Sequence, residues 1–366
     1  MDLRPPRPVF RATPGAIVIV TLVTSVVLGA LAALGALAAC SAPATLSELK
    51  IAEQRADAGD VEGALVAYRA AQRKCGALRP ARRAQAACSE ALLGEAEVLE
   101  HAGRTEPAIR TYLAIPARAT GDPYTASMAV YRAGELLLGD HQVTAAWTQL
   151  WRVVTDYPDE PIAGDALRAI LRDGRRRDAR ALADEMAKLL TPLAETQIAD
   201  NLLWSLADLS EHELGNLPAA RALYDRIPVD TPTSGLRDDA RWHAARISRL
   251  LHDPAGAAQR LRALLATREV ALGAGSYFSI WLDDAQLELG KILRDDLGDL
   301  PGAAAAFRQL PKDYPASILR DDALYELAVT LERMHDHAGA CAALTRLARE
   351  FADSKYLARG QELGCS

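Results

Sequence analysis

Large aromatic side chains are scarce in this sequence. Phe, Trp and Tyr make up only 5% of the 366 residues, whereas 50% of the residues are hydrophobic, with alanine the most frequent of these. Small side chains at contacts let helix axes approach to roughly 8 to 10 Å. The composition therefore favours an array of short, closely packed helices over a single globule with large core layers.

An excess of positive charge is also missing. Lys and Arg together number 42 against 48 Asp and Glu, which gives a formal net charge of −6. The first 39 residues hold three arginines and one aspartate, a charge of +2, so the remainder carries −8. Nucleic-acid-binding proteins present a basic patch or stripe, and we therefore expect no nucleic-acid partner.

The common catalytic and metal-binding motifs do not occur. The sequence has no GxxxxGK[ST], HExxH or GxSxG segment, and no CxxC pair or Cys/His cluster with zinc spacing. These patterns position phosphates, metal ions or a nucleophile. We therefore expect no enzyme, no cofactor, no metal and no small-molecule substrate.

The amino terminus has the layout of an export signal. Three arginines precede an uncharged apolar run over residues 15–39, as in secretory signals. The run ends in Leu37-Ala38-Ala39-Cys40, which resembles the lipobox of bacterial lipoproteins. The resemblance implies cleavage between Ala39 and Cys40 and acylation of Cys40, of the palmitate type. The segments expected are a signal peptide at 1–39, a lipidated tether at 40–44 and a repeat domain at 45–366.

The same resemblance implies an address. Two or three acyl chains hold a protein on a bilayer where one would not, and Ser41 after the cysteine favours the periplasmic face of the outer membrane. An alternative is an uncleaved signal anchor in the inner membrane, because about 20 apolar residues suffice to span a bilayer. Both interpretations place the rest of the chain in the periplasm.

Residues 313–356 show the unit from which the rest is built. Two apolar stripes at helical spacing are joined by a turn at 335–338. A single hairpin cannot bury both stripes, so neighbours must stack on each side. The stripes are Leu324, Leu327, Ala328 and Leu331, then Ala340, Ala343, Leu344 and Leu347.

A turn that contains glycine, often Gly-Asp, stands upstream of a small residue that a larger residue follows at helical spacing, as in Ala108, Tyr112 and Ile115 after Gly103. This pattern resembles the tetratricopeptide repeat. The resemblance implies an all-α fold: an α-α superhelix (solenoid) of about eight helical hairpins after an N-terminal signal helix. The key alanines of the second helices include Ala64, Ala108, Ala146, Ala183, Ala220, Ala257, Ala303 and Ala340. Small contact residues in the first helices are Ala52, Ala96, Gly134, Ala207, Ala245, Gly290 and Ala328.

The array is irregular. The spacing of the key alanines reaches 46 residues between Ala257 and Ala303, against a family period of 34. Loops are expected at 228–235 and 269–275, the first as a candidate boundary between two lobes. Endings such as Tyr157-Pro158 and Tyr314-Pro315 resemble the repeat style of two periplasmic proteins. These are the lipoprotein subunit of the outer-membrane β-barrel assembly machine and the Tol-linked coordinator of cell-wall synthesis.

Four cysteines follow Cys40, an even number in a compartment that permits disulfides. Pairing of neighbours would join Cys75 to Cys88 and Cys341 to Cys365, at the two ends of the array, where terminal repeats lack one neighbour. The alternative is four unpaired buried thiols.

Several charged or aromatic groups invite a functional interpretation. The acidic pairs are best placed at helix starts, where they oppose the helix dipole, rather than in a catalytic site. The segment His335-Asp336-His337 is interpreted as a solvated turn rather than a metal site. The two arginine clusters are interpreted as solvated surface, or as a site for phosphate-bearing lipid or an acidic partner. The tryptophans are interpreted as core residues, or as anchors for a bound peptide. The groups are Asp238-Asp239, Asp283-Asp284 and Asp321-Asp322; Arg172, Arg175, Arg176, Arg177 and Arg180; Arg73, Lys74, Arg79, Arg82 and Arg83; and Trp147, Trp151, Trp204, Trp242 and Trp281.

Together these features predict a lipid-anchored periplasmic scaffold that binds protein partners, and the envelope location favours the proteins of envelope assembly or maintenance as those partners. Two alternatives remain open at the level of sequence. One is an accessory subunit of an envelope enzyme, or a degenerate form of such an enzyme. The other is a signal-anchored structural spacer.

Overall fold

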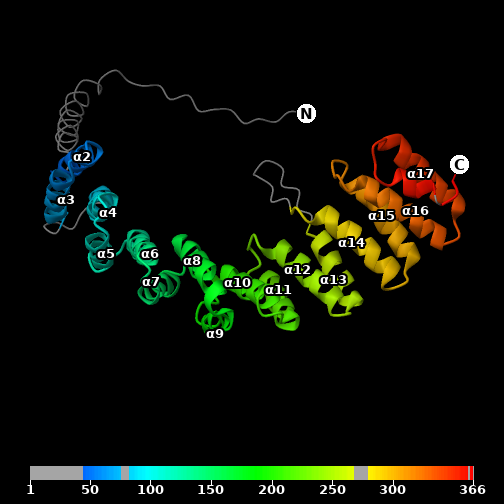
Figure 1. Ribbon diagram of the computed structural model, residues 1–366, viewed down its shortest axis with the longest axis horizontal. Coiled ribbons are helices and arrows are strands. Elements are labelled where there is room, and N and C mark those ends of the chain that lie inside the picture. Colours follow the sequence, from blue (N-terminus) through cyan, green and yellow to red (C-terminus); the bar gives the residue numbers. More distant parts are fainter. Residues whose placement is uncertain (1–43, 76–81, 268–278, 362, 366) are drawn as a thin grey trace, which may run out of the picture. The chain divides into compact units, whose positions relative to one another are not determined.

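A computed structural model of the protein describes residues 44–75, 82–267, 279–361 and 363–365 (Figure 1). All regular structure in these ranges is helical, and they contain no β-strand. The all-α prediction is therefore confirmed. The loop expected at 269–275 lies outside the described residues.

The chain divides into two compact units between Gln142 and Val143. In the first unit, α2 packs against α3 and α4 against α5, while contacts of α3 with α4 and of α5 with α6 join one pair to the next. The helices of this unit are α2 (Ala44–Asp57), α3 (Val61–Cys75), α4 (Arg82–His101), α5 (Thr105–Ala114) and α6 (Pro123–Gly139).

The second unit begins with α7 and continues as five helical pairs and a short terminal helix. Each pair packs internally, and each second helix also contacts the first helix of the following pair, which is the stacking predicted for an α-α superhelix. The helices are α7 (Val143–Asp156), α8 (Ile162–Arg177), α9 (Ala179–Leu189), α10 (Ala199–His212), α11 (Leu217–Asp230), α12 (Arg237–Leu250), α13 (Pro254–Leu265), α14 (Leu282–Asp295), α15 (Leu300–Asp313), α16 (Arg320–Arg333), α17 (His337–Glu350) and α18 (Leu357–Gln361).

In several hairpins the turn is built from a left-handed residue followed by a capping aspartate. In the α14–α15 turn, Gly298 has a φ of 69°, and the Asp299 carboxylate accepts a hydrogen bond of 2.9 Å from the Gly302 backbone N–H. Capping of this kind satisfies an amide that the helix leaves unpaired. In the α16–α17 turn the left-handed residue is His335, with a φ of 63°.

A glycine commonly stands three residues after the cap, for a steric reason. A Cβ atom added to Gly302 would lie 2.2 Å from the Asp299 carboxylate, and one added to Gly339 would lie 2.3 Å from that of Asp336. The pattern Asp-x-x-Gly at a second-helix start therefore follows from close approach of the cap to the backbone.

The small residues predicted at helix contacts are buried. Ala52, Ala96, Ala207 and Ala328 are fully buried. At Gly290 the phenyl ring of Phe307 lies so close that an added Cβ would be 2.4 Å from it. The small side chain in a first helix thus makes room for a large one in the second helix of the same hairpin.

The segment at 228–235 is a loop only in part: residues 231–235 lie outside the helices, as predicted, whereas residues 228–230 belong to α11. Helix α11 continues through Pro228 and ends at Asp230. Pro228 lies in the last turn of α11, and the helix is closed by a hydrogen bond of 3.0 Å from Thr231 N–H to the Ile227 carbonyl. Helices α11 and α12, on either side of this segment, pack against each other within the second unit.

Candidate functional site

The predicted lipid anchor falls on residues that the structure does not describe. Ala39, Cys40 and the apolar run at 15–39 all lie outside the described ranges. Among the helices that are described, none is both long enough and apolar enough to cross a membrane.

Two disulfides lie near the ends of the described chain. Cys75 at the end of α3 is bonded to Cys88 in α4, with Cα atoms 5.8 Å apart. Cys341 in α17 is bonded to Cys365, with Cα atoms 5.3 Å apart. These are the pairs that neighbour pairing favours in the sequence. Closing loops of this size removes entropy worth roughly 3 kcal/mol each from the unfolded state.

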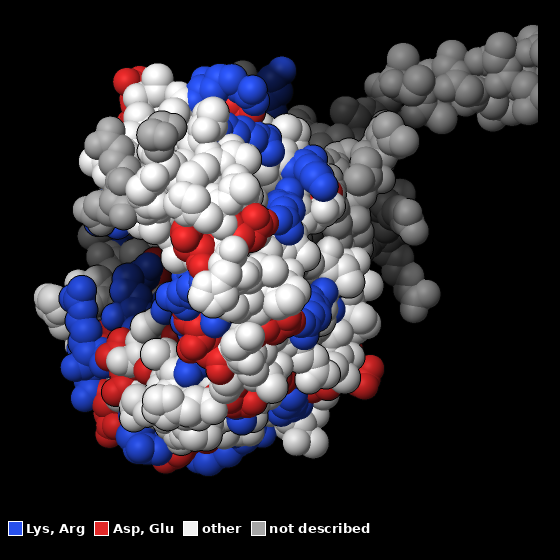
Figure 2. Space-filling model, turned by 90° about the vertical axis from the view of Figure 1, so that its right-hand side faces the viewer, with Lys and Arg blue, Asp and Glu red and all other residues white. Residues whose placement is uncertain are grey.

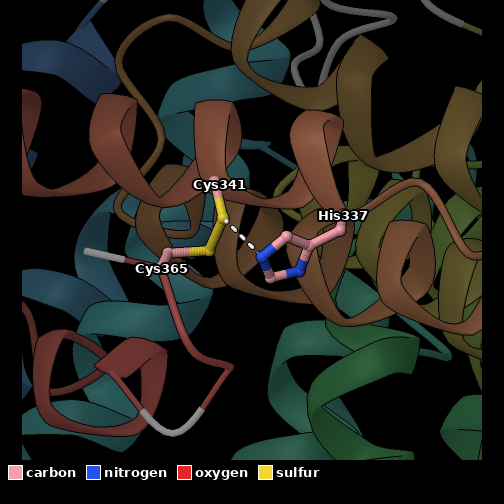
Figure 3. A group of neighbouring side chains, drawn as sticks. All are labelled: His337, Cys341 and Cys365. Carbon is pink, nitrogen blue, oxygen red and sulfur yellow. Dashed lines mark hydrogen bonds between the residues drawn. A yellow bond between two sulfur atoms is a disulfide. The ribbon is translucent and has the colours of Figure 1, made fainter.

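The segment His335-Asp336-His337 forms the expected turn, but its members differ in role. His335 takes the left-handed conformation and Asp336 caps α17. His337 lies beside the second disulfide, with its Nε2 atom 3.5 Å from Cys341 Sγ (Figure 3). Its Nδ1 atom is 2.5 Å from Glu332 Oε1. His337 and Cys341 lie one helical turn apart in α17, so the predicted pairing of Cys341 with Cys365 already places the histidine beside the disulfide.

The acidic pairs lie where they were predicted, in the first turns of α12, α14 and α16. They also have a second role, as acceptors between neighbouring hairpins. The hydroxyl of Ser317 donates to Asp283 over 2.6 Å, and that of Ser354 donates to Asp321 over 2.7 Å. The first carboxylate of a pair is therefore bonded to the loop that follows its own hairpin and leads onward along the chain.

The second carboxylate of a pair receives an aromatic donor from further along the chain. Trp281 donates from Nε1 to Asp239 over 2.7 Å, and the Tyr356 hydroxyl donates to Asp322. Burial of the Tyr356 hydroxyl raises its pKa, and the hydrogen bond from this hydroxyl to the Asp322 carboxylate acts in the same direction. The pairs thus hold neighbouring repeats together, and this accounts for their recurrence without catalysis.

The remaining tryptophans of the second unit serve mainly in packing. Trp204 is half-buried and meets Tyr224 edge-on at 5.1 Å between ring centroids. Trp242 and Trp281 are stacked at 5.1 Å. These contacts agree with the core role favoured from the sequence.

Trp147 and Trp151 differ from them, because they line an open pocket of about 540 Å³ between α7, α8 and α9. The Trp147 ring is fixed by a hydrogen bond of 2.9 Å from Nε1 to Asp173. Gly174 leaves space for it, since an added Cβ would lie 2.9 Å from the indole. The pocket also includes Arg177 at its border.

The arginine cluster at the end of α8 is partly neutralised. Arg175 pairs with Asp208, and Arg177 pairs with Asp173 over 2.7 Å. Arg176 and Arg180 are exposed and make no ion pair within the described part of the chain. In the second cluster, Lys74 pairs with Glu48 over 2.8 Å; Arg79 and the side chains of Arg82 and Arg83 lie outside what is described.

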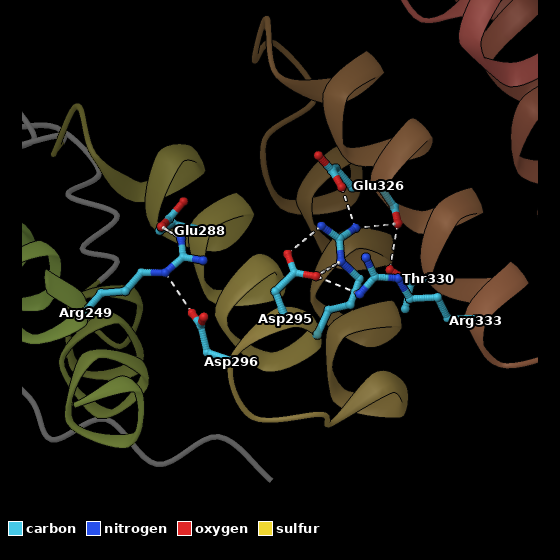
Figure 4. Close-up of polar contacts among 8 residues, drawn as sticks. Arg249, Glu288, Asp295, Asp296, Glu326, Thr330 and Arg333 are labelled. Carbon is cyan, nitrogen blue, oxygen red and sulfur yellow. Dashed lines mark hydrogen bonds and ion pairs between the residues drawn. The ribbon is translucent and has the colours of Figure 1, made fainter. Parts of the chain in front are cut away.

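Elsewhere in the second unit, charges are paired from hairpin to hairpin. Arg249 pairs with Glu288 and, over 2.7 Å, with Asp296 (Figure 4). Arg294, whose side chain is 7% exposed, pairs with Glu326 and, over 2.8 Å, with Asp295. On the face shown in Figure 2, basic and acidic side chains are interspersed rather than gathered into one field.

Comparison with known protein families identifies the repeats in the second unit. A sequence model of the tetratricopeptide repeat matches residues 284–317 and 322–354. Two hairpins of the second unit therefore match the tetratricopeptide repeat. The two matched segments contain α15 and most of α14, then α16 and α17, so each is one hairpin. None of the curated proteins matches the sequence.

Several solved structures resemble this chain. PilF from Pseudomonas aeruginosa is 16% identical, with 64% of this chain and 96% of that chain covered and a TM-score of 0.37. PilW, described as a widely conserved type IV pilus biogenesis factor, is 14% identical, with 74% and 97% covered and a TM-score of 0.35. YrrB, described as having an unusual peptide-binding site, is 13% identical, with 58% and 97% covered and a TM-score of 0.38.

Proposed function

We propose that this tetratricopeptide-repeat protein is a lipid-anchored scaffold on the periplasmic face of the outer membrane, which binds protein partners in envelope assembly or maintenance. The observation that carries the proposal is the fold itself: rows of stacked hairpins expose an extended surface suited to protein binding. The lipobox-like segment ending at Cys40 supports the anchor. The two disulfides support an oxidising compartment.

Within this function, the pocket at Trp147 and Trp151 is the surface that we assign to a partner. Tryptophan and arginine are the residues most enriched among those that dominate binding energies at interfaces. Here both tryptophans line one open pocket, and Arg177 stands at its border. The Trp147 indole is already held in place by Asp173, so less side-chain freedom is lost when a partner binds.

The partner expected there is a protein segment that combines an apolar side chain with acidic residues. The carboxylates beside the pocket are engaged within the protein: Asp178 caps α9 by accepting from Ala181 N–H over 2.9 Å, and Glu185 pairs with Lys188 over 2.6 Å. The guanidinium groups of Arg176 and Arg180 have no such partners among the described residues. An acidic segment would therefore find unpaired positive charge at two residues that flank the pocket residues Arg177 and Asp178 in the sequence.

Binding at this pocket can be tested by photo-cross-linking in cells. A photoreactive amino acid at Thr148, which is exposed and lines the pocket, is expected to give a discrete protein adduct, and the same amino acid at exposed Arg308 in α15 is the control. The adduct at 148 should weaken when Arg176 and Arg180 are changed to Glu. With the partner identified, Trp151→Ala should lower its affinity roughly 30-fold, as expected for the loss of about 2 kcal/mol at an interface hot spot. Adducts that are the same at both positions, or that do not respond to charge reversal, would contradict this site.

The anchor has a separate test. In a two-membrane bacterial host, the wild-type chain is expected to incorporate labelled palmitate and to accumulate as a larger precursor when the lipoprotein signal peptidase is inhibited. Cys40→Ser should incorporate no label, whereas a Cys75→Ser/Cys88→Ser control should be labelled like the wild type. If the wild-type chain takes up no label and its size does not change with the inhibitor, the lipid anchor is contradicted and the signal anchor is the better interpretation.

A further inference from the structure

A histidine side chain lies beside the second disulfide, between Cys341 and Cys365. His337, Cys341 and Cys365 bring one imidazole nitrogen and two sulfur atoms within 4.8 Å of one another, the one such group found among the described residues (Figure 3). Imidazole and thiolate together are the donor set that suits Zn²⁺. No comparable group surrounds the Cys75–Cys88 disulfide within the described part of the chain.

The spacing of the histidine fits a metal site. In a tetrahedral zinc site with Zn–N near 2.05 Å and Zn–S near 2.3 Å, the nitrogen and sulfur ligands are about 3.5 Å apart. The Nε2 atom of His337 is 3.5 Å from Cys341 Sγ. The two sulfurs would have to move from bonding distance to about 3.8 Å, which requires that the disulfide be reduced.

A carboxylate stands behind the histidine. Glu332 Oε1 is 2.5 Å from His337 Nδ1, which places the proton on Nδ1 and leaves the Nε2 lone pair directed at the sulfurs. A carboxylate in this position orients a metal-ligating histidine and raises its basicity. A simple structural disulfide does not require either residue.

The tail that carries Cys365 has contacts of its own. Leu357 and Leu363 pack against the core formed by α14 to α17, as does Cys365. Loss of the covalent bond would therefore leave apolar contacts that keep the Cys365 sulfur close to α17. The His337 side chain is 58% exposed, so a metal ion can reach the site and water can occupy a fourth position.

We propose that reduction converts the Cys341–Cys365 cross-link into a Cys₂His site for a thiophilic divalent cation such as Zn²⁺. Two equivalents of a thiol reduce the disulfide and become a disulfide themselves, leaving two cysteine thiols. The cation then binds both sulfurs and His337 Nε2, and the two thiol protons pass to water. The chain would thus close its carboxyl end with a covalent bond under oxidising conditions and with a metal ion under reducing conditions.

The experiment uses the full chain in detergent with Cys75→Ser/Cys88→Ser, so that one cysteine pair remains beyond the acylated Cys40. After reduction with a phosphine and removal of the reductant under nitrogen, Co²⁺ is added as a spectroscopic probe. One Co²⁺ per chain is expected, with a thiolate-to-cobalt charge-transfer band that Zn²⁺ displaces. The oxidised protein and a variant that also carries Cys341→Ser/Cys365→Ser should show no such band.

The role of the histidine is tested by variants that leave both cysteines in place. Glu332→Gln is expected to weaken Co²⁺ binding by roughly 10- to 100-fold, as is usual for the partner of a ligating histidine, and His337→Gln by at least as much. His335→Asn, two residues away, is the matched control and should bind like the parent. Circular dichroism establishes that each variant is folded. Co²⁺ binding by the reduced parent that is no stronger than in the variant lacking Cys341 and Cys365 would overturn the proposal, as would unchanged Co²⁺ binding by His337→Gln.

Discussion

Replacing Phe307 with alanine is expected to lower the free energy of unfolding by about 4 kcal/mol, the middle of the range for a buried Phe→Ala change. The ring is fully buried and fills the space that Gly290 leaves open in the facing helix. Because Gly290 has no side chain that can move into the cavity, little of the lost packing can be recovered. Urea-induced unfolding followed by circular dichroism measures the effect.

Ile318→Ala is the control for this change, because its side chain is 87% exposed and surface substitutions usually stay within about 0.5 kcal/mol. Gly290→Ala tests the contact from the other side: it should destabilise the fold, and by less when Phe307 is also changed to Leu, because the two positions share one space. Equal effects of Phe307→Ala and Ile318→Ala would show that this contact does not hold the hairpin together.

Arg294→Ala is expected to lower the free energy of unfolding by about 3 kcal/mol, at the lower end of the range for breaking a buried ion pair. The substitution removes the partner of Glu326, which is 17% exposed, and of Asp295, which is 31% exposed. It also removes a guanidinium that lies 5.6 Å from the centre of the Phe307 ring. Arg308→Ala, at an exposed position of the same unit, should change the unfolding free energy by less than about 0.5 kcal/mol.

The Arg294 effect should depend on pH. Hydrogen bonds from Arg294 lower the pKa of Asp295 from 3.8 to about 2. A carboxylate whose pKa is lower in the folded state stabilises the fold above its unfolded pKa and loses that contribution as pH falls through the folded one. The difference in unfolding free energy between wild type and Arg294→Ala should therefore be constant from pH 7 to 5 and shrink between about pH 4 and 2. A difference that is flat down to pH 2 would contradict the role assigned to Asp295.

The hairpins could be predicted from the sequence, because the residues that define each helix lie close together along the chain. The stripe at Leu324, Leu327 and Leu331 and the small contact at Gly290 repeat at helical spacing, and the structure buries all of these residues. A further local signal went unused: Asp299 and Gly302, like Asp336 and Gly339, form the Asp-x-x-Gly cap. It could have fixed the start of each second helix to the residue.

Contacts between repeats could not be predicted in the same way. The partner of Asp283 is Ser317, 34 residues away, and nothing in the residues themselves says which of many serines will face it. The pocket at Trp147 likewise depends on where α8 and α9 lie relative to α7.

The two disulfides also set how far the chain can be drawn out under tension. They join residues that are 13 and 24 positions apart in the sequence, and an extended chain spans about 3.5 Å per residue. Because the two cross-links themselves still span 5.8 and 5.3 Å between Cα atoms, an oxidised molecule pulled from both ends would stretch about 120 Å less than a reduced one before its contour is exhausted. Single-molecule extension traces would register each cross-link as a missing length of chain.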